Sequence, residues 1–201
     1  MSAKNRKKQS NLGDFYPTPM KLVRAGFDKL VEEFPMVTRS RFFLEPGSGR
    51  GNFCAVAGSY LPRCETHGVE LHRIQGERFG YKLHMADFLK WDTYLRFGLV
   101  ATNPPFIPFP QFILKSRELL TPGGLMFYLL RIGALGSKKR IEFWQQIDLK
   151  RVWLCRPRPS FEVDGGTDAT EYAFFVMGGG ASRSKKPEFD WLDWKGDENA
   201  E

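Results

Sequence analysis

The sequence is poor in the residues that stabilise small secreted or metal-binding proteins. Its 201 residues include three cysteines, Cys54, Cys64 and Cys155, at unrelated spacings and without a CxxC pair, and only three histidines. Scattered cysteines in odd number do not support a disulfide framework, and these residues lack the spacing of zinc ligands. We therefore expect reduced thiols and no bound metal.

A long apolar run is also missing. No stretch reaches the roughly 20 apolar residues of a membrane-spanning helix, and the first ten residues are polar and basic, unlike a signal peptide. The composition, 42% hydrophobic and 26% charged, is that of a globular protein. We expect a cytoplasmic protein without a membrane partner.

Positive charge is in excess, and most of it lies in the central part of the chain. Of the net charge of +7, residues 1–10 carry four positive charges, and residues 188–201 carry six acidic residues against one lysine. This leaves +8 on residues 11–187. A basic body favours a polyanionic partner such as nucleic acid, although many soluble proteins share this balance.

Composition and hydrophobic pattern divide the chain into three parts. We predict a flexible basic arm over 1–13, one α/β domain over 14–180 and a flexible acidic tail over 181–201. Within the domain, short apolar runs alternate with amphipathic stretches until the last two runs, which follow each other directly. This order predicts a Rossmann-like, seven-stranded, mostly parallel sheet with a terminal antiparallel hairpin.

The most informative stretch is Asn103-Pro104-Pro105-Phe106. It follows an apolar run, 97–101, with the length of a buried parallel strand, and open α/β sheets bind ligands just past the ends of such strands. Two prolines stiffen the loop. The Asn103 amide oxygen and the Pro104 carbonyl suit an exocyclic amine, and Phe106 suits the ring that carries it. Taken alone, Pro-Pro could also serve only to end the strand.

A glycine-rich turn joins the first predicted strand to a helix, with the sequence Glu45-Pro46-Gly47-Ser48-Gly49-Arg50-Gly51-Asn52-Phe53. Such a turn lets the backbone approach a ligand at the helix N-terminus. Its spacing is neither that of a Walker loop nor GxGxxG, and the Glu45 carboxylate suits a cationic amino group better than a phosphate.

Two more acids, Glu70 and Asp87, end the next two predicted strands. Glu70 stands 25 positions after Glu45, near the spacing at which an acidic residue binds ribose hydroxyls in doubly wound folds. Before the first amphipathic helix, we predict Thr18 as the N-cap and Pro19 as the first helical residue.

These residues together resemble the class I S-adenosylmethionine-dependent methyltransferases, in particular adenine-N6 DNA methyltransferases of the small phage-encoded type. The resemblance spans about Tyr16 to Met177 and is strongest in the glycine loop and in the Asn-Pro-Pro-Phe motif. It implies methyl transfer from S-adenosylmethionine to the N6 amine of adenine in DNA. It also implies a monomer or weak dimer in a bacterial or phage-infected cell.

The resemblance also implies roles for individual residues. The glycine loop would hold the methionine part of the cofactor, Glu70 the ribose, and Asp87 with the Phe88 backbone the adenine. Phe161 is a candidate for stacking on the face of the target base opposite Phe106. The implied catalytic residues are Asn103, Pro104, Pro105 and Phe106, and the implied cofactor residues are Tyr16, Thr18, Pro19, Glu45, Pro46, Gly47, Gly49, Gly51, Phe53, Glu70, Leu71, Asp87 and Phe88.

One departure from the family concerns DNA recognition. Larger DNA methyltransferases carry a target-recognition domain, and no stretch after the predicted sheet is long enough for one. Basic residues in two loops are then the candidates for contacting a nucleic acid backbone, with solvated surface charge as the alternative for each. They are Lys138, Lys139, Arg140, Arg156 and Arg158.

Other functions remain open at this stage. Asn-Pro-Pro-aromatic loops also occur in methyltransferases of RNA bases and of protein glutamine, because a planar amide amine presents the same geometry. An inactive cofactor-binding or nucleic-acid-binding subunit is a further alternative. A dehydrogenase-like Rossmann enzyme would lack its glycine spacing and leave the Asn-Pro-Pro-Phe motif unexplained.

Overall fold

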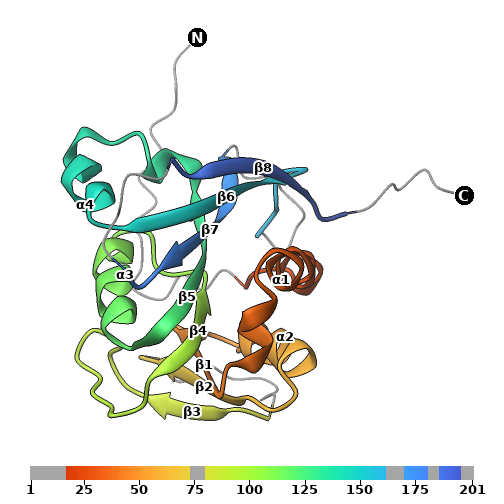
Figure 1. Cartoon of the computed structure of the whole chain (residues 1–201), viewed down its shortest axis with the longest axis vertical. Coiled ribbons are helices and arrows are strands. Elements are labelled where there is room, and N and C mark those ends of the chain that lie inside the picture. Colours follow the sequence, from red (N-terminus) through yellow and green to blue (C-terminus); the bar gives the residue numbers. More distant parts are fainter. Residues whose placement is uncertain (1–16, 73–79, 162–169, 181–185, 196–201) are drawn as a thin grey trace, which may run out of the picture.

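The fold is a three-layer α/β sandwich, seen in a computed structural model that describes residues 17–72, 80–161, 170–180 and 186–195. Helices α1 and α2 cover one face of the sheet, and α3 and α4 cover the other (Figure 1). The elements are α1 (Met20–Glu33), η1 (Pro35–Arg39), β1 (Phe42–Pro46), α2 (Asn52–Tyr60), β2 (Glu65–Glu70), β3 (Lys82–Met85), β4 (Phe97–Thr102), α3 (Phe109–Glu118), β5 (Leu120–Arg131), η2 (Ile132–Ala134), η3 (Lys138–Arg140), α4 (Ile141–Gln145), β6 (Asp148–Arg156), β7 (Tyr172–Gly178) and β8 (Glu188–Asp193).

The sheet is mostly parallel, with strand order β3-β2-β1-β4-β5-β7-β6-β8. Strands β1 to β5 run parallel, whereas β7 lies antiparallel between β5 and β6. Strand order reverses between the neighbours β1 and β4, and open α/β sheets bind ligands at the carboxyl ends of the strands beside such a reversal. The predicted parallel sheet with a terminal antiparallel hairpin is therefore confirmed.

The predicted strand count is wrong by one, because the described residues form eight strands. The eighth strand, β8, comes from the stretch that we expected to be a flexible acidic tail. It pairs in parallel with β6 at the edge of the sheet. Only Leu192 of its six residues is buried, so the sequence lacks the apolar run that marks a central strand.

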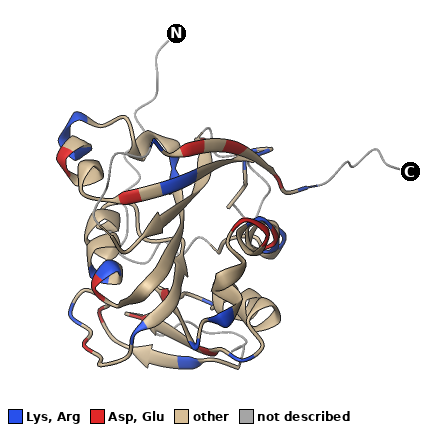
Figure 2. Cartoon of the chain, in the orientation of Figure 1, with Lys and Arg blue, Asp and Glu red and all other residues tan. Residues whose placement is uncertain are grey.

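Ion pairs hold the acidic side chains of β8 to the basic side chains beside it. Asp190 lies 2.5 Å from Lys29 Nζ, Glu188 lies 3.1 Å from Arg151 Nη2, and Asp193 lies 2.6 Å from Arg156 Nε. Three of the six residues of β8 are acidic, and they lie near basic residues of β6 and α1 (Figure 2). The charges of this stretch, which suggested a solvated tail, complement the basic body instead.

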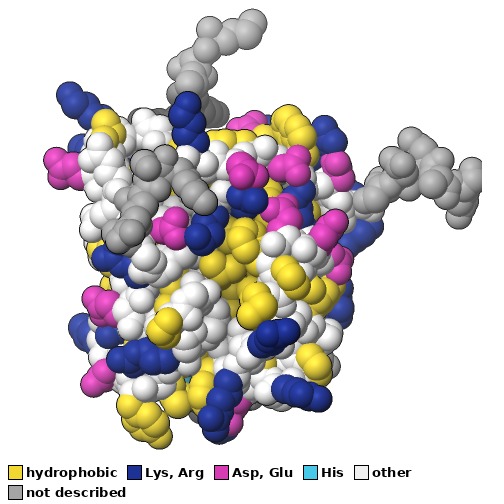
Figure 3. Space-filling view, viewed as in Figure 1, with side chains coloured by type: hydrophobic (Ala, Val, Ile, Leu, Met, Phe, Trp, Pro, Cys, Tyr) yellow, Lys and Arg dark blue, Asp and Glu magenta, His cyan; other side chains and the backbone are white. Residues whose placement is uncertain are grey.

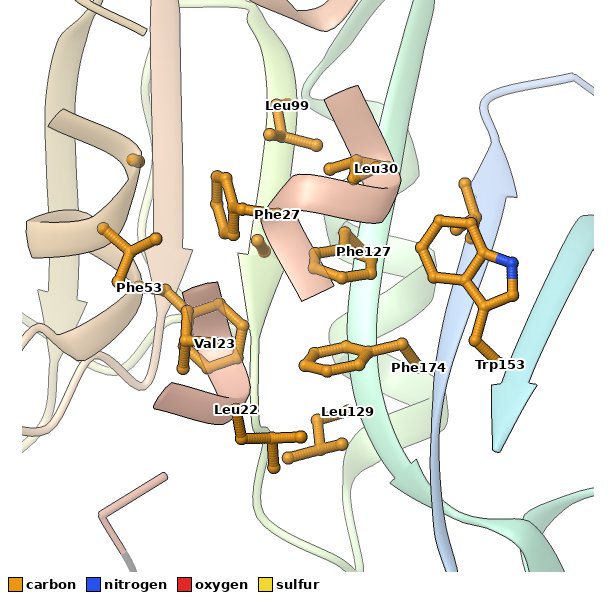
Figure 4. Close-up of a cluster of buried hydrophobic side chains, with 14 of the residues drawn as sticks. Leu22, Val23, Phe27, Leu30, Phe53, Leu99, Phe127, Leu129, Trp153 and Phe174 are labelled. Atoms are coloured by element: carbon orange, nitrogen blue, oxygen red, sulfur yellow. The ribbon is translucent and has the colours of Figure 1, made fainter. Parts of the chain in front are cut away.

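Helix α1 lies very close to the middle of the sheet. Its buried residues Leu22, Val23, Phe27 and Leu30 pack over the rings of Phe127, Phe174 and Trp153 (Figure 4). Gly26 permits this approach, because a Cβ there would lie 2.8 Å from the Phe174 ring. The Phe127 and Phe174 rings stack with centroids 4.3 Å apart, and this core fixes the strands whose ends form the site. In the described part of the chain, no helix has the length and apolar character of a membrane span.

Candidate active site

The glycine loop follows β1 and the Asn-Pro-Pro-Phe loop follows β4, and these two strands lie side by side in the sheet. Thr102, the last residue of β4, donates a hydrogen bond from Oγ1 to the Pro46 carbonyl at 2.6 Å. A Cβ on Gly47 would lie 3.8 Å from Pro105 Cδ. The glycine loop and the Asn-Pro-Pro-Phe loop therefore touch, as the sequence predicts for a shared site.

Three glycines shape the loop after β1. Gly47, Gly49 and Gly51 have φ values of 63°, 53° and 79°, in the left-handed region that strongly favours glycine. A side chain on Gly51 would also overlap the ring of Tyr81. These positions let the loop fold tightly in front of α2 and bring its backbone to the carboxyl edge.

Glu45 is engaged by the protein itself. Its side chain is buried, and its two carboxyl oxygens accept hydrogen bonds from the Phe53 amide at 3.3 Å and the Cys54 amide at 2.8 Å. It thus satisfies amides of the first turn of α2, which lack partners within the helix. Burial raises the pKa of Glu45 to about 8, against the opposing effect of these hydrogen bonds. Its predicted contact with a cationic amino group stays a prediction.

Glu70 ties the second strand to the glycine loop. Its Oε2 accepts a hydrogen bond from the Gly49 amide at 2.8 Å, and its Oε1 accepts one from the His72 amide at 3.0 Å. Each carboxylate oxygen can accept more than one hydrogen bond, so ribose hydroxyls fit the remaining capacity. The neighbouring Leu71 side chain is 54% exposed and is available to an apolar ligand surface.

Asp87 and Phe88 follow β3 at the same edge. Asp87 Oδ1 accepts a hydrogen bond from the Leu89 amide at 3.0 Å, and Oδ2 lies 3.6 Å from Lys90 Nζ. The Phe88 side chain is buried, and its ring centroid lies 5.0 Å from that of Phe112. Only the backbone of Phe88 is thus left for the predicted contact with adenine.

The segment before α1 joins the two loops. The Thr18 hydroxyl accepts a hydrogen bond from Asn103 Nδ2 at 3.2 Å, and the Thr18 carbonyl accepts one from Asn52 Nδ2 at 2.7 Å. Our prediction of Thr18 as N-cap is wrong: Pro19 precedes the first helical residue, Met20, and no side chain caps the helix. The Thr18 hydroxyl serves Asn103 instead. Tyr16 lies outside the described residues.

Two buried oxygen atoms in these loops have no hydrogen-bond partner within the described part of the chain. They are Oδ1 of Asn103 and Oγ of Ser48. Because the Asn103 amide nitrogen is fixed on Thr18, its oxygen is held as an acceptor without a donor. Pro104 beside it is buried, whereas Pro105 and Phe106 are exposed.

An aromatic and cationic group surrounds Phe106. The Arg131 guanidinium carbon lies 3.9 Å from the Phe106 ring centroid, and Arg131 Nε donates to the Tyr172 hydroxyl at 3.1 Å. Phe161 is buried, and its ring centroid lies 4.7 Å from that of Tyr172. The Tyr172 centroid lies 6.4 Å from that of Phe106. Stacking of Phe161 on a base stays a prediction.

Arg131 and Tyr172 were not among the predicted site residues. Both stand at strand ends, Arg131 at the carboxyl end of β5 and Tyr172 at the start of the antiparallel β7. Arg131 directly follows the apolar run 125–130, so the sequence places it at the end of a predicted strand, where site residues are expected. Nothing in the sequence placed Tyr172 beside it, because that contact depends on the antiparallel pairing.

The predicted basic contacts fall into two groups. Lys138 and Lys139 are exposed in η3, and the Arg140 guanidinium lies 4.9 Å from the ring centroid of Phe109, at the start of α3. Arg156 instead pairs with both carboxylate oxygens of Asp193, at 2.6 and 2.7 Å, and Arg158 lies 3.9 Å from Glu171. The structure thus gives Arg156 and Arg158 acidic partners within the protein. Within the described ranges, no group of three His, Cys, Asp or Glu side chains could hold a metal ion.

The sequence matches no protein-family model and no curated protein. The structure is similar to that of a Pyrococcus horikoshii protein assigned as an RNA methyltransferase, with TM-score 0.64 and 14% identity over 85% of this chain and 89% of that one. It is also similar to a Listeria monocytogenes protein assigned to the class I S-adenosylmethionine-dependent methyltransferases, with TM-score 0.63 and 12% identity over 89% of this chain and 66% of that one.

A third similar structure is the M protein of the type I restriction enzyme EcoKI, with TM-score 0.58 and 16% identity. The match covers 84% of this chain and 46% of the M protein, so the chain spans less than half of that protein's length. At such low identities the likeness concerns the backbone arrangement alone. The chain has the fold of the class I S-adenosylmethionine-dependent methyltransferases.

Proposed function

We propose that this protein is an S-adenosylmethionine-dependent N-methyltransferase that acts on the exocyclic N6 amine of adenine in DNA. The observation that carries the proposal is the buried Asn103 Oδ1, an acceptor without a partner in the described part of the chain. It lies just beyond the carboxyl end of β4, at the reversal of strand order where this fold class binds ligands.

An unpaired buried acceptor is costly, at about 1–3 kcal/mol. Such a cost is typical of a site where a ligand supplies the missing donor. The Asn103 amide nitrogen donates to the Thr18 hydroxyl, and its oxygen, which can only accept a hydrogen bond, is left for a ligand. An amine N–H is the complementary donor, and the stiff Pro104-Pro105 pair holds further carbonyl oxygens beside it.

The residues around the glycine loop fit the cofactor. Left-handed glycines expose the backbone of the loop, Glu70 has acceptor capacity for ribose hydroxyls, and the Ser48 hydroxyl is buried without a partner in the described ranges. S-adenosylmethionine, when bound, would supply an electrophilic methyl group on a positively charged sulfur. The glycine loop would hold its methionine part, Glu70 its ribose, and Asp87 with the Phe88 backbone its adenine.

The protein's own residues would prepare the amine for reaction. Asn103 Oδ1 and the Pro104 carbonyl would accept hydrogen bonds from its two N–H groups and so increase electron density on its nitrogen. Phe106, exposed beside them, would stack on the base and fix its plane. Positioning and electrostatic stabilisation of this kind account for much of enzymatic rate enhancement. The base must leave a duplex to reach the loop.

The choice of DNA rests on the adenine-N6 resemblance and on the basic body, which carries +8 over residues 11–187. Of the similar structures, one is the M protein of a restriction enzyme and another is assigned as an RNA methyltransferase. Methyl transfer to RNA is therefore the competing outcome in the assay below.

The test is transfer of labelled methyl from S-adenosylmethionine to unmethylated duplex DNA, followed by nucleoside analysis. We expect N6-methyladenine from the wild-type protein and a loss of at least about 100-fold in Asn103→Ala, with cofactor affinity nearly unchanged. Arg63→Ala, which removes an exposed side chain between α2 and β2, is the control and should keep full activity. Label in RNA alone, or full activity in Asn103→Ala, would contradict the proposal.

A further inference from the structure

The side chain of Phe106 is held by Arg131, a residue from a different strand. The Arg131 guanidinium carbon lies 3.9 Å from the Phe106 ring centroid, which is the separation of a stacked cation–π pair. Phe106 belongs to the loop after β4, whereas Arg131 ends β5. The contact therefore fixes a loop side chain on the rigid sheet.

Arg131 is itself anchored. Its Nε donates to the Tyr172 hydroxyl at 3.1 Å, and the two residues are register partners in the β5–β7 ladder. Tyr172 is 1% exposed and packs against the buried Phe161 ring at 4.7 Å. A buried tyrosine thus holds the guanidinium, and the guanidinium covers one face of the Phe106 ring.

The environment of Phe106 makes such an anchor necessary. The ring is 36% exposed, and the next residue, Ile107, is 86% exposed. An exposed aromatic side chain in a loop would otherwise sample several rotamers, and ordering it would cost free energy each time a ligand stacks on it. A ring that is already ordered avoids this cost when a base stacks on it.

We infer that Arg131 is a positioning residue that, together with Tyr172, pre-orients the Phe106 ring for stacking on a planar heteroaromatic substrate. The inference rests on the proposed function, in which Phe106 stacks on the target base. Arg131 would act through Phe106 and would not need to touch the reacting atoms. Its removal should therefore weaken substrate binding much more than the rate of transfer from bound substrate.

The test is a double-mutant cycle between Arg131→Ala and Phe106→Leu, measured by methyl transfer to DNA. For Arg131→Ala alone, we expect KM for DNA to rise roughly 2- to 30-fold, the range of a cation–π contact, with kcat changed much less. In the Phe106→Leu background, Arg131→Ala should add little, because the ring on which it acts is gone. Arg131→Lys keeps the cation but loses the planar stack, so its KM should lie between those of the wild-type protein and Arg131→Ala.

Arg63→Ala is the matched control, since it removes an exposed arginine between α2 and β2, at the opposite edge of the sheet. A lower KM in Arg131→Ala would mean that the guanidinium competes with the base for Phe106, and this would overturn the inference. Equal effects of Arg131→Ala with and without Phe106 would overturn it as well. If Arg131→Ala does not fold, Arg131→Lys and Tyr172→Phe replace it, and each is combined with Phe106→Leu in the same double-mutant cycle.

A second readout separates this inference from the proposed function. In protein labelled with ¹³C on its phenylalanine rings, the Phe106 signals are identified by their loss in Phe106→Leu. We expect Arg131→Ala to shift or broaden these signals and Arg63→Ala to leave them unchanged. Unchanged signals in Arg131→Ala would overturn the inference, whereas wild-type protein without methyl transfer to nucleic acid would overturn only the proposed function.

Discussion

At the scale of single residues, two opposing effects act on the pKa of the Glu45 carboxyl group. Its burial favours the neutral carboxyl group, whereas the amides of Phe53 and Cys54 favour the carboxylate. Burial has the larger effect, since the pKa of Glu45 is raised from 4.5 to about 8. The folded protein therefore retains a proton that the unfolded chain has already lost at neutral pH.

This difference predicts a pH-dependent stability. Glu45 contributes fully to the stability of the folded state below pH 4.5. This contribution is lost as the pH rises through 8, because the carboxyl group of the unfolded chain ionises at a lower pH than that of the folded protein. We expect the wild-type free energy of unfolding to fall over this window relative to Glu45→Gln, by an amount on the order of a few kcal/mol. Urea unfolding of both proteins at pH 5 and pH 8 measures it. A constant difference between them would show that Glu45 has an ordinary pKa.

At the scale of secondary-structure elements, β8 contributes through its one buried side chain. Leu192 is 5% exposed and belongs to the core cluster that also contains residues of α1. The ion pair of Asp193 with Arg156 is exposed on both sides, with 58% and 55% of the side chains accessible. Exposed ion pairs add little to stability because water screens them.

We therefore expect Leu192→Ala to destabilise the protein by about 2–4 kcal/mol, the usual cost of truncating a buried leucine. Asp193→Asn, one residue away on the same strand, should leave the unfolding free energy almost unchanged. Chemical denaturation of the two variants gives the comparison. A loss in Asp193→Asn as large as that in Leu192→Ala would show that the ion pair stabilises β8 as much as its apolar contact does, contrary to this expectation.

At the scale of the whole molecule, positive and negative side chains are interspersed on the face seen in Figure 3. On the face seen in Figure 3, basic and acidic side chains surround a central group of hydrophobic ones, so this face carries no large patch of one sign. Near the proposed site, the exposed Lys138 and Lys139 follow β5, and Arg140 lies beside the start of α3. These loop residues are candidates for phosphate contacts.

This arrangement predicts salt-dependent binding to DNA. Each phosphate contact adds about 0.9 to the slope of log affinity against log salt concentration. Replacing both Lys138 and Lys139 by Ala should reduce that slope by up to about 2, with similar losses for all DNA sequences. Fluorescence anisotropy at several salt concentrations gives the slopes, with Arg63→Ala as the control for a general loss of charge. An unchanged slope would assign the two lysines to solvent alone.

The order of residues along the chain was enough to predict the parallel sheet and the edge at which the candidate site residues gather. Alternating apolar runs and amphipathic stretches fix strand and helix order, and the connections of parallel strands place successive carboxyl ends at one edge. For this reason the glycine loop, Glu70, Asp87 and Asn103 could be expected together. Their chemical roles remain predictions, since residue types at strand ends suggest a ligand but do not demonstrate one.

Which side chains are already engaged by the protein becomes visible in three dimensions alone. The bond between Thr18 and Asn103, the placement of Arg131 on Phe106 and the pairing of β8 with β6 each join residues far apart in the chain. Local periodicity carries no signal for such contacts. They form because burial leaves polar groups and edge strands in need of partners, and the fold determines which partner is within reach.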